Sequence, residues 1–168
     1  MKKLTQSIII CFSLSILPSF TLAEDKIAVI NMQGAVLTTQ FARQQQKTLN
    51  ENTEYKKLVE RLQQLKVDLQ TLEENANNWS AEQKTEHTNK TADYQQVTKQ
   101  IDLHRNKVGL VIKKQFEGAV KEVIDKIIKE EGITLLLNAK AAYFAAPGYD
   151  ITKKVAAALD ARHQTGAN

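Results

Sequence analysis

The sequence of 168 residues predicts an α+β fold in which a small β-strand body carries a long antiparallel α-helical coiled-coil hairpin. Apolar residues between Tyr55 and Leu72 recur alternately three and four positions apart, which is the spacing of a coiled-coil seam. A second run with this spacing extends from Tyr94 to Val111, beyond a short Asn-rich break, so the two helices can pair. Short segments rich in β-branched and other apolar residues flank this hairpin, which predicts a body built where the chain begins and ends.

Residues 1–23 have the pattern of a secretory signal peptide, with two lysines, an apolar stretch over residues 8–17 and a small-residue cleavage site at residues 21–23. The apolar stretch is too short to span a bilayer. Cys11 lies inside this stretch rather than at its end, so we expect no lipid anchor. The mature chain would begin near Glu24 without a cysteine, which is compatible with a periplasmic protein that has no disulfide bonds.

The first element of the mature chain is predicted over residues 26–32 (KIAVINM), where a β-branched run without a helical stripe indicates a buried strand that ends at Gly34. From about residue 35 to about residue 76, glutamine, lysine, glutamate and leucine dominate, which predicts one long helix. Few apolar side chains are available for a seam between residues 41 and 55. We therefore expect this first part of the helix to be weakly paired or to start late.

The tip of the hairpin is predicted at residues 75–80, because asparagine tolerates turn conformations. Ser80 and Gln83 have the spacing of a capping box, which predicts that the returning helix begins at about residue 81. This helix is expected to continue to about residue 131. Its apolar face widens from Val108 onward, so its last part should be buried in the body.

The C-terminal part of the chain predicts two further strands and a helix. Gly132 is the expected C-cap of the returning helix. Residues 133–138 predict a second buried strand, and residues 141–144 predict a third, weaker strand. Asp150 is placed to cap a final helix over residues 151–162, whose apolar residues share one face.

These elements divide the mature chain into a body, formed by residues 24–40 and 112–168, and an arm over residues 41–111. Three short strands make a very small sheet with exposed edges, so we expect the body to complete its sheet by association of several chains. The residues expected in the core of the body are Ile27, Val29, Ile30, Phe116, Leu135, Leu136 and Leu137.

No motif in the sequence points to catalysis. There is no phosphate-binding glycine loop and no HExxH pair, and the mature chain would have no cysteine as nucleophile or metal ligand. The histidines are dispersed and the carboxylates fall on exposed helix faces, so we predict no enzyme, no cofactor and no metal site. The net charge is +4, and basic residues gather between positions 94 and 116. The preferred interpretation of this run is a solvated helix face, and the alternative is a surface for acidic partners. The signal peptide and the lack of aromatic residues among the lysines argue against nucleic acid.

The order of the elements is specific: a signal peptide, the KIAVINM strand, a long hairpin rich in Gln, Lys and Leu, the segment GITLLLNAKAAYFA and the helix YDITKKVAAAL. In this order the chain resembles the Skp/OmpH family of periplasmic chaperones over essentially all of the mature sequence. The resemblance implies a homotrimer whose strands join in a central β body and whose hairpins surround a cavity. It also implies that unfolded outer-membrane β-barrel proteins are held soluble in this cavity, without ATP, for delivery to the outer membrane.

The arm contains the candidate binding residues. The segment with Arg105 and Lys107 is similar to a basic region through which family members interact with lipopolysaccharide, and Lys99 lies nearby. Tyr94, Val97 and Trp79 are the candidates for contact with unfolded clients, but for Trp79 we favour a structural role in closing the tip. The Asn-rich tip with acidic flanks departs from the strongly basic tip that is typical of the family.

The alternative function is that of an exported structural or adaptor coiled coil that binds one folded partner. A single defined partner needs a compact apolar or aromatic hot spot on the arm. Only Trp79 and Tyr94 suggest such a spot in this sequence.

Overall fold

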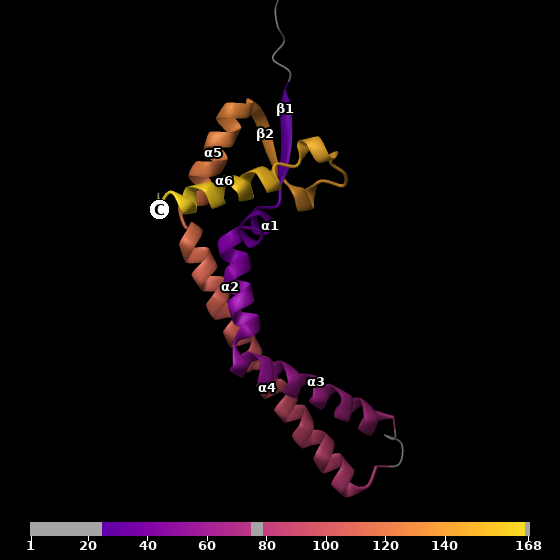
Figure 1. Cartoon of the computed structure of the whole chain (residues 1–168). Helices are drawn as coiled ribbons and strands as arrows, with labels where there is room; N and C mark the ends of the chain where they lie inside the picture. The colour runs from indigo at the N-terminus through magenta and orange to yellow at the C-terminus, as the bar shows by residue number, and fades with distance from the viewer. Residues whose placement is uncertain (1–24, 75–78, 167–168) are drawn as a thin grey trace, which may run out of the picture.

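The computed structural model of the protein describes residues 25–74 and 79–166, and it has the expected α+β architecture. A small body with a two-stranded sheet lies at one end, and a helical hairpin projects from it (Figure 1). We call the paired helices between residues 40 and 111 the arm and the remaining described residues the body. The predicted signal peptide, residues 1–23, lies outside the described residues.

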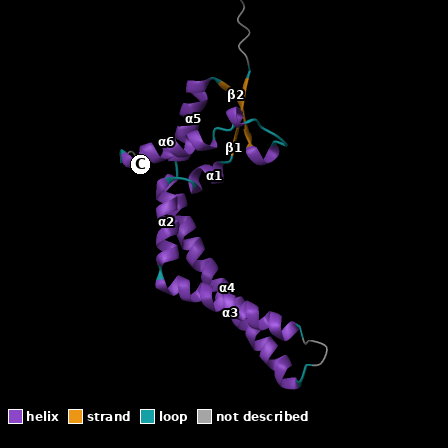
Figure 2. Ribbon diagram, turned by 45° about the vertical axis from the view of Figure 1, so that its right-hand side comes forward, coloured by secondary structure: helices purple, strands orange, loops and turns teal. Residues whose placement is uncertain are grey.

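The sheet of the body consists of β1 (Lys26–Ile30) and β2 (Ile133–Asn138), which are parallel although the whole arm separates them in sequence (Figure 2). The predicted first strand is correct in place but ends earlier than expected. Asn31 follows β1 directly, and its side chain accepts a hydrogen bond from the backbone N–H of Gly34 at 2.9 Å. This cap starts α1 (Met32–Leu37), so the prediction that Gly34 terminates the strand is wrong.

The predicted third strand over residues 141–144 is wrong. Asn138 ends β2, and its side chain accepts the N–H of Lys140 at 2.9 Å, which turns the chain into the short 3₁₀ helix η2 (Ala139–Ala141). A second 3₁₀ helix, η3 (Pro147–Tyr149), follows, and Ile151 then donates its N–H to the carbonyl of Val29 at 3.0 Å. Within the described residues, no strand pairs with the outer edge of β2.

The predicted outgoing helix over residues 35–76 is divided into three pieces. After α1, Thr39 caps α2 (Gln40–Glu51) and Asn52 caps α3 (Thr53–Glu73), because their side-chain oxygens accept hydrogen bonds from the backbone N–H groups of Ala42 and Tyr55. Asparagine and threonine side chains compete with the helical backbone for such hydrogen bonds, which is why strong helix formers on either side did not keep the helix continuous. The first part of the predicted arm helix, where few apolar residues are available for a seam, is nevertheless helical as α2, and it packs against the returning helix.

The returning helix begins as predicted and ends earlier than predicted. Ser80 and Gln83 form the capping box of α4 (Ala81–Phe116), which confirms that prediction. The prediction of a continuous helix to residue 131 is wrong, because Gly118 adopts φ 85° and separates α4 from α5 (Ala119–Glu131). Gly132 has left-handed geometry with φ 64° and is the C-cap of α5, as expected.

The last helix, α6 (Thr152–Gln164), packs against α1 and α5. Asp150 accepts the N–H of Thr152 at 2.8 Å, as its predicted capping role requires. Thr152 in turn accepts the N–H of Asn31 at 2.9 Å, which joins the start of α6 to the end of β1. The core between these elements includes Ala28, Ile30, Phe116, Ile124, Ile133, Ile151, Val155 and Leu159.

The expected body core is only partly a core in this subunit. Val29, Ile30 and Phe116 are buried, and Leu136 packs against the core while partly buried. Ile27, Leu135 and Leu137 are exposed in this subunit, so they are not part of the core that one chain forms by itself. Successive residues of a strand point to opposite faces, and the helices of one chain cover only the face that carries Ala28 and Ile30. The other face of the sheet stays exposed except at Val29, which is buried beside the segment that contains η3 and Asp150.

Candidate functional site

The arm is held together by one continuous apolar seam. Leu49, Tyr55 and Leu65 from α2 and α3 are buried against Val97 and Ile101 from α4. Leu58, Leu62, Tyr94 and Val108 extend this cluster and are partly buried. The prediction that Val111 lies in the seam is wrong, since its side chain is exposed and the next buried residue of α4 is Ile112.

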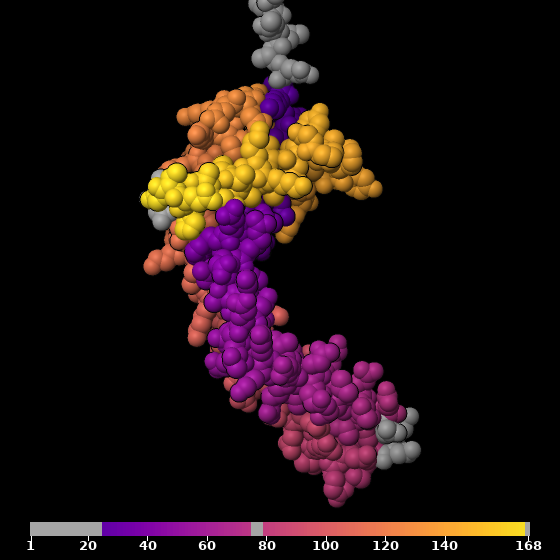
Figure 3. Space-filling view, in the orientation of Figure 1, coloured from indigo at the N-terminus to yellow at the C-terminus, as the bar shows by residue number. Residues whose placement is uncertain are grey.

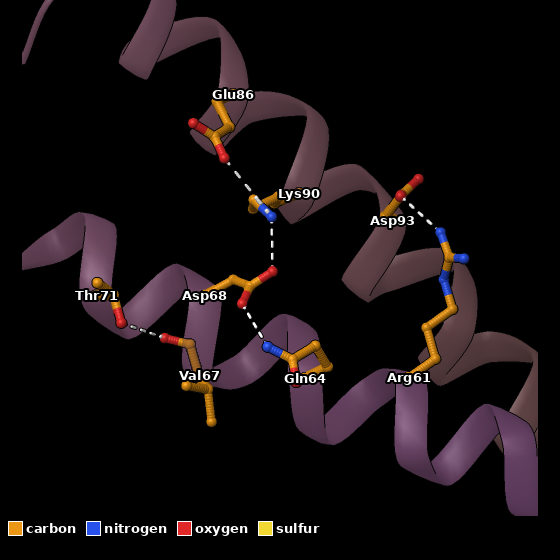
Figure 4. A network of polar contacts seen from close by, with 8 residues as sticks. All are labelled: Arg61, Gln64, Val67, Asp68, Thr71, Glu86, Lys90 and Asp93. Atoms are coloured by element: carbon orange, nitrogen blue, oxygen red, sulfur yellow. Dashed lines mark hydrogen bonds and ion pairs between the residues drawn. The ribbon is translucent and has the colours of Figure 1, made fainter.

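The distal half of the seam is closed mainly by polar contacts (Figure 4). Asp68 on α3 accepts hydrogen bonds from Gln64 at 2.7 Å and from Lys90 on α4 at 2.6 Å. Lys90 also lies 3.6 Å from Glu86. The hydrogen bond from Lys90 lowers the pKa of Asp68, and the same bond raises the pKa of Lys90. Both side chains therefore remain charged at neutral pH.

A second ion pair crosses the same two helices. Arg61 on α3 donates to Asp93 on α4 at 2.9 Å. Both side chains of this pair are at least half exposed, so the pair adds little to the stability of the arm by itself. Its position beside the Asp68–Lys90 pair fixes the register of α3 against α4.

Trp79 closes the tip of the arm. Its indole N–H donates to the backbone carbonyl of Leu72 at 2.8 Å, near the end of α3. Its ring lies 4.7 Å from the ring of His87, which is 3.4 Å from Glu73. The side chain thus satisfies a carbonyl at a helix C-terminus, and these contacts support the structural role that we favoured for Trp79.

Near the boundary between α2 and α3, α4 contributes two polar side chains to the seam. Arg105 donates from Nε to the hydroxyl of the buried Tyr55 at 3.0 Å. The ring of His104 lies 6.0 Å from that of Tyr55, and its Nε2 lies 4.0 Å from Glu54. These contacts anchor Tyr55 on α4 at the point where the outgoing helix is interrupted.

The three predicted basic residues do not form one patch. All three side chains are exposed on α4. At 100° per residue, Lys107 lies about 80° around the helix axis from Lys99, whereas Arg105 lies about 120° from Lys99 in the other direction. Arg105 is also engaged by Tyr55 and lies 4.0 Å from Asp102. The structure therefore keeps Lys99 and Lys107 on one face and places Arg105 on another.

Sequence reasoning missed the residues that share a face with Lys99 and Lys107. Leu103 and Leu110 have 59% and 65% of their surface exposed, on the face opposite the seam. Their spacing from Lys99, four and eleven positions, is the signal that could have identified this face. We call it the outer stripe, and it consists of Lys99, Leu103, Lys107, Leu110 and Lys114.

The predicted client-contact residues differ in accessibility. Val97 has only 5% of its surface exposed and belongs to the seam, so it is not accessible to a client in this conformation. Tyr94 is partly buried in the same cluster. Trp79 is partly buried by its contacts with Leu72 and His87. The exposed apolar side chains of the arm lie elsewhere, at Val59, Val67, Leu103, Leu110 and Val111.

The body exposes a large apolar surface. Ile27 on β1 is paired in register with Leu135 on β2, and both are exposed on the open face of the sheet together with Leu137. In the segment that follows, Tyr143 and Phe144 are exposed to 108% and 81%. We call these five residues the open apolar face. A single soluble chain would not be expected to leave so many large apolar side chains in water.

An open groove with a volume of about 710 Å³ lies where α1, α4 and α5 meet. Its apolar lining includes Val36, Ile112, Phe116 and Ile124. Among the residues that the structure describes, no group of three His, Cys, Asp or Glu side chains is arranged to hold a metal ion. In the same part of the chain, no helix combines the length and the apolar character needed to cross a membrane.

Comparison with known proteins identifies the family. A family model described as "Outer membrane protein (OmpH-like)" matches residues 26–159. No match was found among curated proteins. The chain is also similar to the crystal structure of an OmpH-like protein from Caulobacter crescentus CB15, with 19% sequence identity, a TM-score of 0.48 and coverage of 83% of this chain and 86% of that chain. The family match spans both strands and the entire arm, and the chain therefore belongs to the OmpH-like family.

Proposed function

We propose that this protein is an ATP-independent periplasmic holdase that binds unfolded outer-membrane β-barrel proteins and keeps them soluble for delivery to the outer membrane. Membership of the OmpH-like family supports a general role as a chaperone. The observation that carries the proposal is the arm itself, which presents isolated apolar side chains among charged ones along its length. Such a surface offers many weak contacts rather than one defined pocket.

The proposed assembly is a homotrimer that forms through the body. The open apolar face and the unpaired outer edge of β2 lie together in the body, and a second chain placed on them would remove both from water. Closed cyclic symmetry completes such an interface in every copy. Three arms would then project from one shared body and enclose a client between them.

Client capture follows from repetition of weak contacts. The exposed side chains Leu103, Leu110 and Val111 on α4 and Val59 and Val67 on α3 lie among polar residues, and only Leu110 and Val111 are adjacent in sequence. No single patch is therefore large enough to cause self-aggregation. Several arms that act together raise the apparent affinity, because each further contact to a bound client is intramolecular. Release needs no nucleotide when folding of the client removes its apolar surface.

The outer stripe is the proposed contact for anionic partners such as lipopolysaccharide or an acidic membrane surface. Lys99 and Lys107 lie within about 80° of each other on α4. The exposed Leu103 lies between them in sequence, and the exposed Leu110 follows Lys107 by three positions. Alternating cationic and apolar side chains suit a ligand that is anionic and amphipathic. Arg105 contributes less to this contact, because its guanidinium already donates to Tyr55.

The test is suppression of aggregation. We would dilute several unrelated outer-membrane proteins from urea into buffer with and without the processed protein, and follow light scattering. The proposal predicts protection of all of them without ATP. Protection of none would contradict it.

The adaptor alternative has less support. It requires an accessible aromatic hot spot, for which Trp79 and Tyr94 were the candidates. Trp79 is engaged by Leu72 and His87, and Tyr94 is part of the seam.

A further inference from the structure

The outgoing helix of the arm is interrupted at one residue, Asn52, whereas α4 runs past the same level without a break. Asn52 has an extended backbone with ψ 124° and serves both as the C-cap of α2 and as the N-cap of α3. Its own N–H donates to the carbonyls of Thr48 and Leu49, and its side chain accepts the N–H of Tyr55 at 2.9 Å. The arm changes direction at this residue (Figures 1 and 3).

The spacing of the seam explains why the interruption is needed. Leu49 and Tyr55 are both buried against α4, and they lie six positions apart. In a continuous α-helix, six residues correspond to a rotation that leaves Tyr55 about 120° away from the face of Leu49. One continuous helix could not bury both side chains in the same seam. The break at Asn52 rotates α3 relative to α2, so that Tyr55 faces α4 as Leu49 does.

Contacts on both sides of Asn52 hold this arrangement in place. Tyr55 is anchored by Arg105 at 3.0 Å and lies beside His104. Leu49 is buried one turn before the break. Neither proline nor glycine occurs between residues 48 and 56, so the change of direction depends on the asparagine cap and on the six-residue spacing.

We infer that Asn52 is a positioning residue that sets the curvature of the arm, and that this curvature determines the size of unfolded client that the arms enclose. This inference rests on the proposed holdase function. The helix α3 is a rod about 30 Å long at 1.5 Å per residue, so each 20° of straightening displaces its far end by about 10 Å. A straighter outgoing helix would therefore change where the exposed Val59 and Val67 on α3 lie relative to a client.

A straight-arm variant can be designed from the spacing. Asn52→Ala removes the cap, and one alanine inserted after it lengthens the interval between Leu49 and Tyr55 to seven positions. Seven residues return the helix to within about 20° of the starting face, so a continuous helix can then bury both side chains. Asn52→Asp keeps a capping side chain, and Asn50→Ala removes an exposed asparagine inside α2 that caps nothing. Both serve as controls.

The first measurement is the distance between spin labels at Gln44→Cys on α2 and Gln70→Cys on α3, in labelled subunits diluted with unlabelled protein. A straight helix separates these positions by about 40 Å. We expect the straight-arm variant to approach this distance, and the wild type and both control variants to share a shorter one. An unchanged distance in the straight-arm variant would overturn the inference.

The second measurement is the affinity of each variant for a short and a long client, an unfolded eight-stranded and an unfolded sixteen-stranded outer-membrane protein. We expect the straight-arm variant to bind the short client at least about fivefold more weakly, with affinity for the long client changed less than about twofold. Equal affinities for both clients in a variant whose distance has lengthened would also overturn the inference. If the wild type binds neither client, the proposed function fails and this inference with it, whereas the distances still report whether Asn52 shapes the arm.

Discussion

At the scale of single residues, Gly118 provides the backbone conformation that separates α4 from α5. Its φ of 85° lies in a region that residues with a Cβ adopt only with strain, although no atom lies within 4 Å of the position that a Cβ would occupy. The chain therefore turns here because of the backbone alone. Phe116 and Ala119 are buried on either side, so the turn also orients two core residues.

Gly118→Ala should lower the free energy of unfolding by about 1–3 kcal/mol, because the alanine must adopt this strained conformation. Gly109→Ala is the matched control, since Gly109 lies inside α4 with open space around its Cβ position. That substitution should raise stability by up to about 1 kcal/mol through lower entropy of the unfolded chain. Urea denaturation measures both, and equal effects of the two substitutions would contradict this account of Gly118.

Glu131 joins three elements of the body through its carboxylate. Lys154 on α6 and Lys26 on β1, the latter at 2.8 Å, both donate to it, and the carboxylate is mostly buried. The hydrogen bond from Lys154 and then that from Lys26 lower the pKa of Glu131 below its ordinary value of 4.5. A lowered pKa in the folded state means that the stabilisation is present above the unfolded-state value and is lost as the pH falls through the folded-state value.

Glu131→Gln should therefore destabilise the protein by about 1 kcal/mol at pH 7, and this difference should shrink as the pH falls below 4. Glu130→Gln is the control, because Glu130 forms an exposed ion pair with Lys126 within the same helix. Urea denaturation of the three proteins at several pH values provides the measurement. A difference between wild type and Glu131→Gln that stays constant down to acidic pH would show that the two lysines do not act through the charged carboxylate.

At the scale of elements, the arm depends on a seam that is one or two side chains wide. Ile101 has only 2% of its surface exposed and lies at the centre of the apolar cluster of the arm. Beyond Leu65 the two helices are held chiefly by the Asp68–Lys90 pair and by Trp79, and the Arg61–Asp93 pair lies one turn before Leu65. The apolar part of the seam must therefore provide most of the stability of the arm.

Ile101→Ala should destabilise the arm by about 2–5 kcal/mol, because the cavity it leaves is bordered by α3. Leu103→Ala lies two positions away on the outer stripe and should change stability by less than about 0.5 kcal/mol. Hydrogen exchange followed by mass spectrometry should show faster exchange in α3 and α4 of the first variant, with protection in β2 and α6 unchanged. Equal exchange in the two variants would contradict the assignment of the seam.

Periodicity predicted the arm well, because the heptad spacing in α3 and α4 expresses directly the burial of one helix face against the other. It did not predict the breaks. The residues around Asn52 favour helix locally, and only the six-residue interval between Leu49 and Tyr55 contains the information that the helix must be interrupted. The break at Gly118 was not predicted either, because a sequence does not tell which sign of φ a glycine adopts.

The body was harder to predict, because its strands are short and few contacts specify them. Residues 26–32 and 133–138 have clear strand composition, and strands form over residues 26–30 and 133–138. Residues 141–144 have a weak strand signal, and within this chain no neighbouring edge accepts them among the described residues. Ile27, Leu135 and Leu137 are exposed in the single chain, and the apolar pattern alone does not reveal that the helices of one chain cover only one face of the sheet.

At the scale of the whole molecule, the protein combines a small body with an arm of much greater reach. The body alone has an open apolar face and a strand edge without a partner among the described residues. We attribute this surface to contacts with other copies of the chain. The arm, in contrast, distributes its exposed apolar residues so that association through it would be weak.

The double substitution Tyr143→Ser and Phe144→Ser should dissociate the proposed oligomer while leaving the fold of each subunit intact, because both side chains are exposed in the single chain. Leu103→Ser, a similar change on the arm, should leave the oligomer unchanged. Sedimentation equilibrium and circular dichroism distinguish assembly from folding. An oligomer that withstands the double substitution at micromolar concentration would exclude these two side chains from the interface.

In the proposed assembly, several arms on a shared body hold one unfolded outer-membrane protein. Native mass spectrometry would give the mass of the complex formed when such a protein is diluted from urea into the processed protein. We expect a complex of three copies of this chain with one client. A complex with a single copy of the chain, or no complex at all, would contradict the proposed assembly.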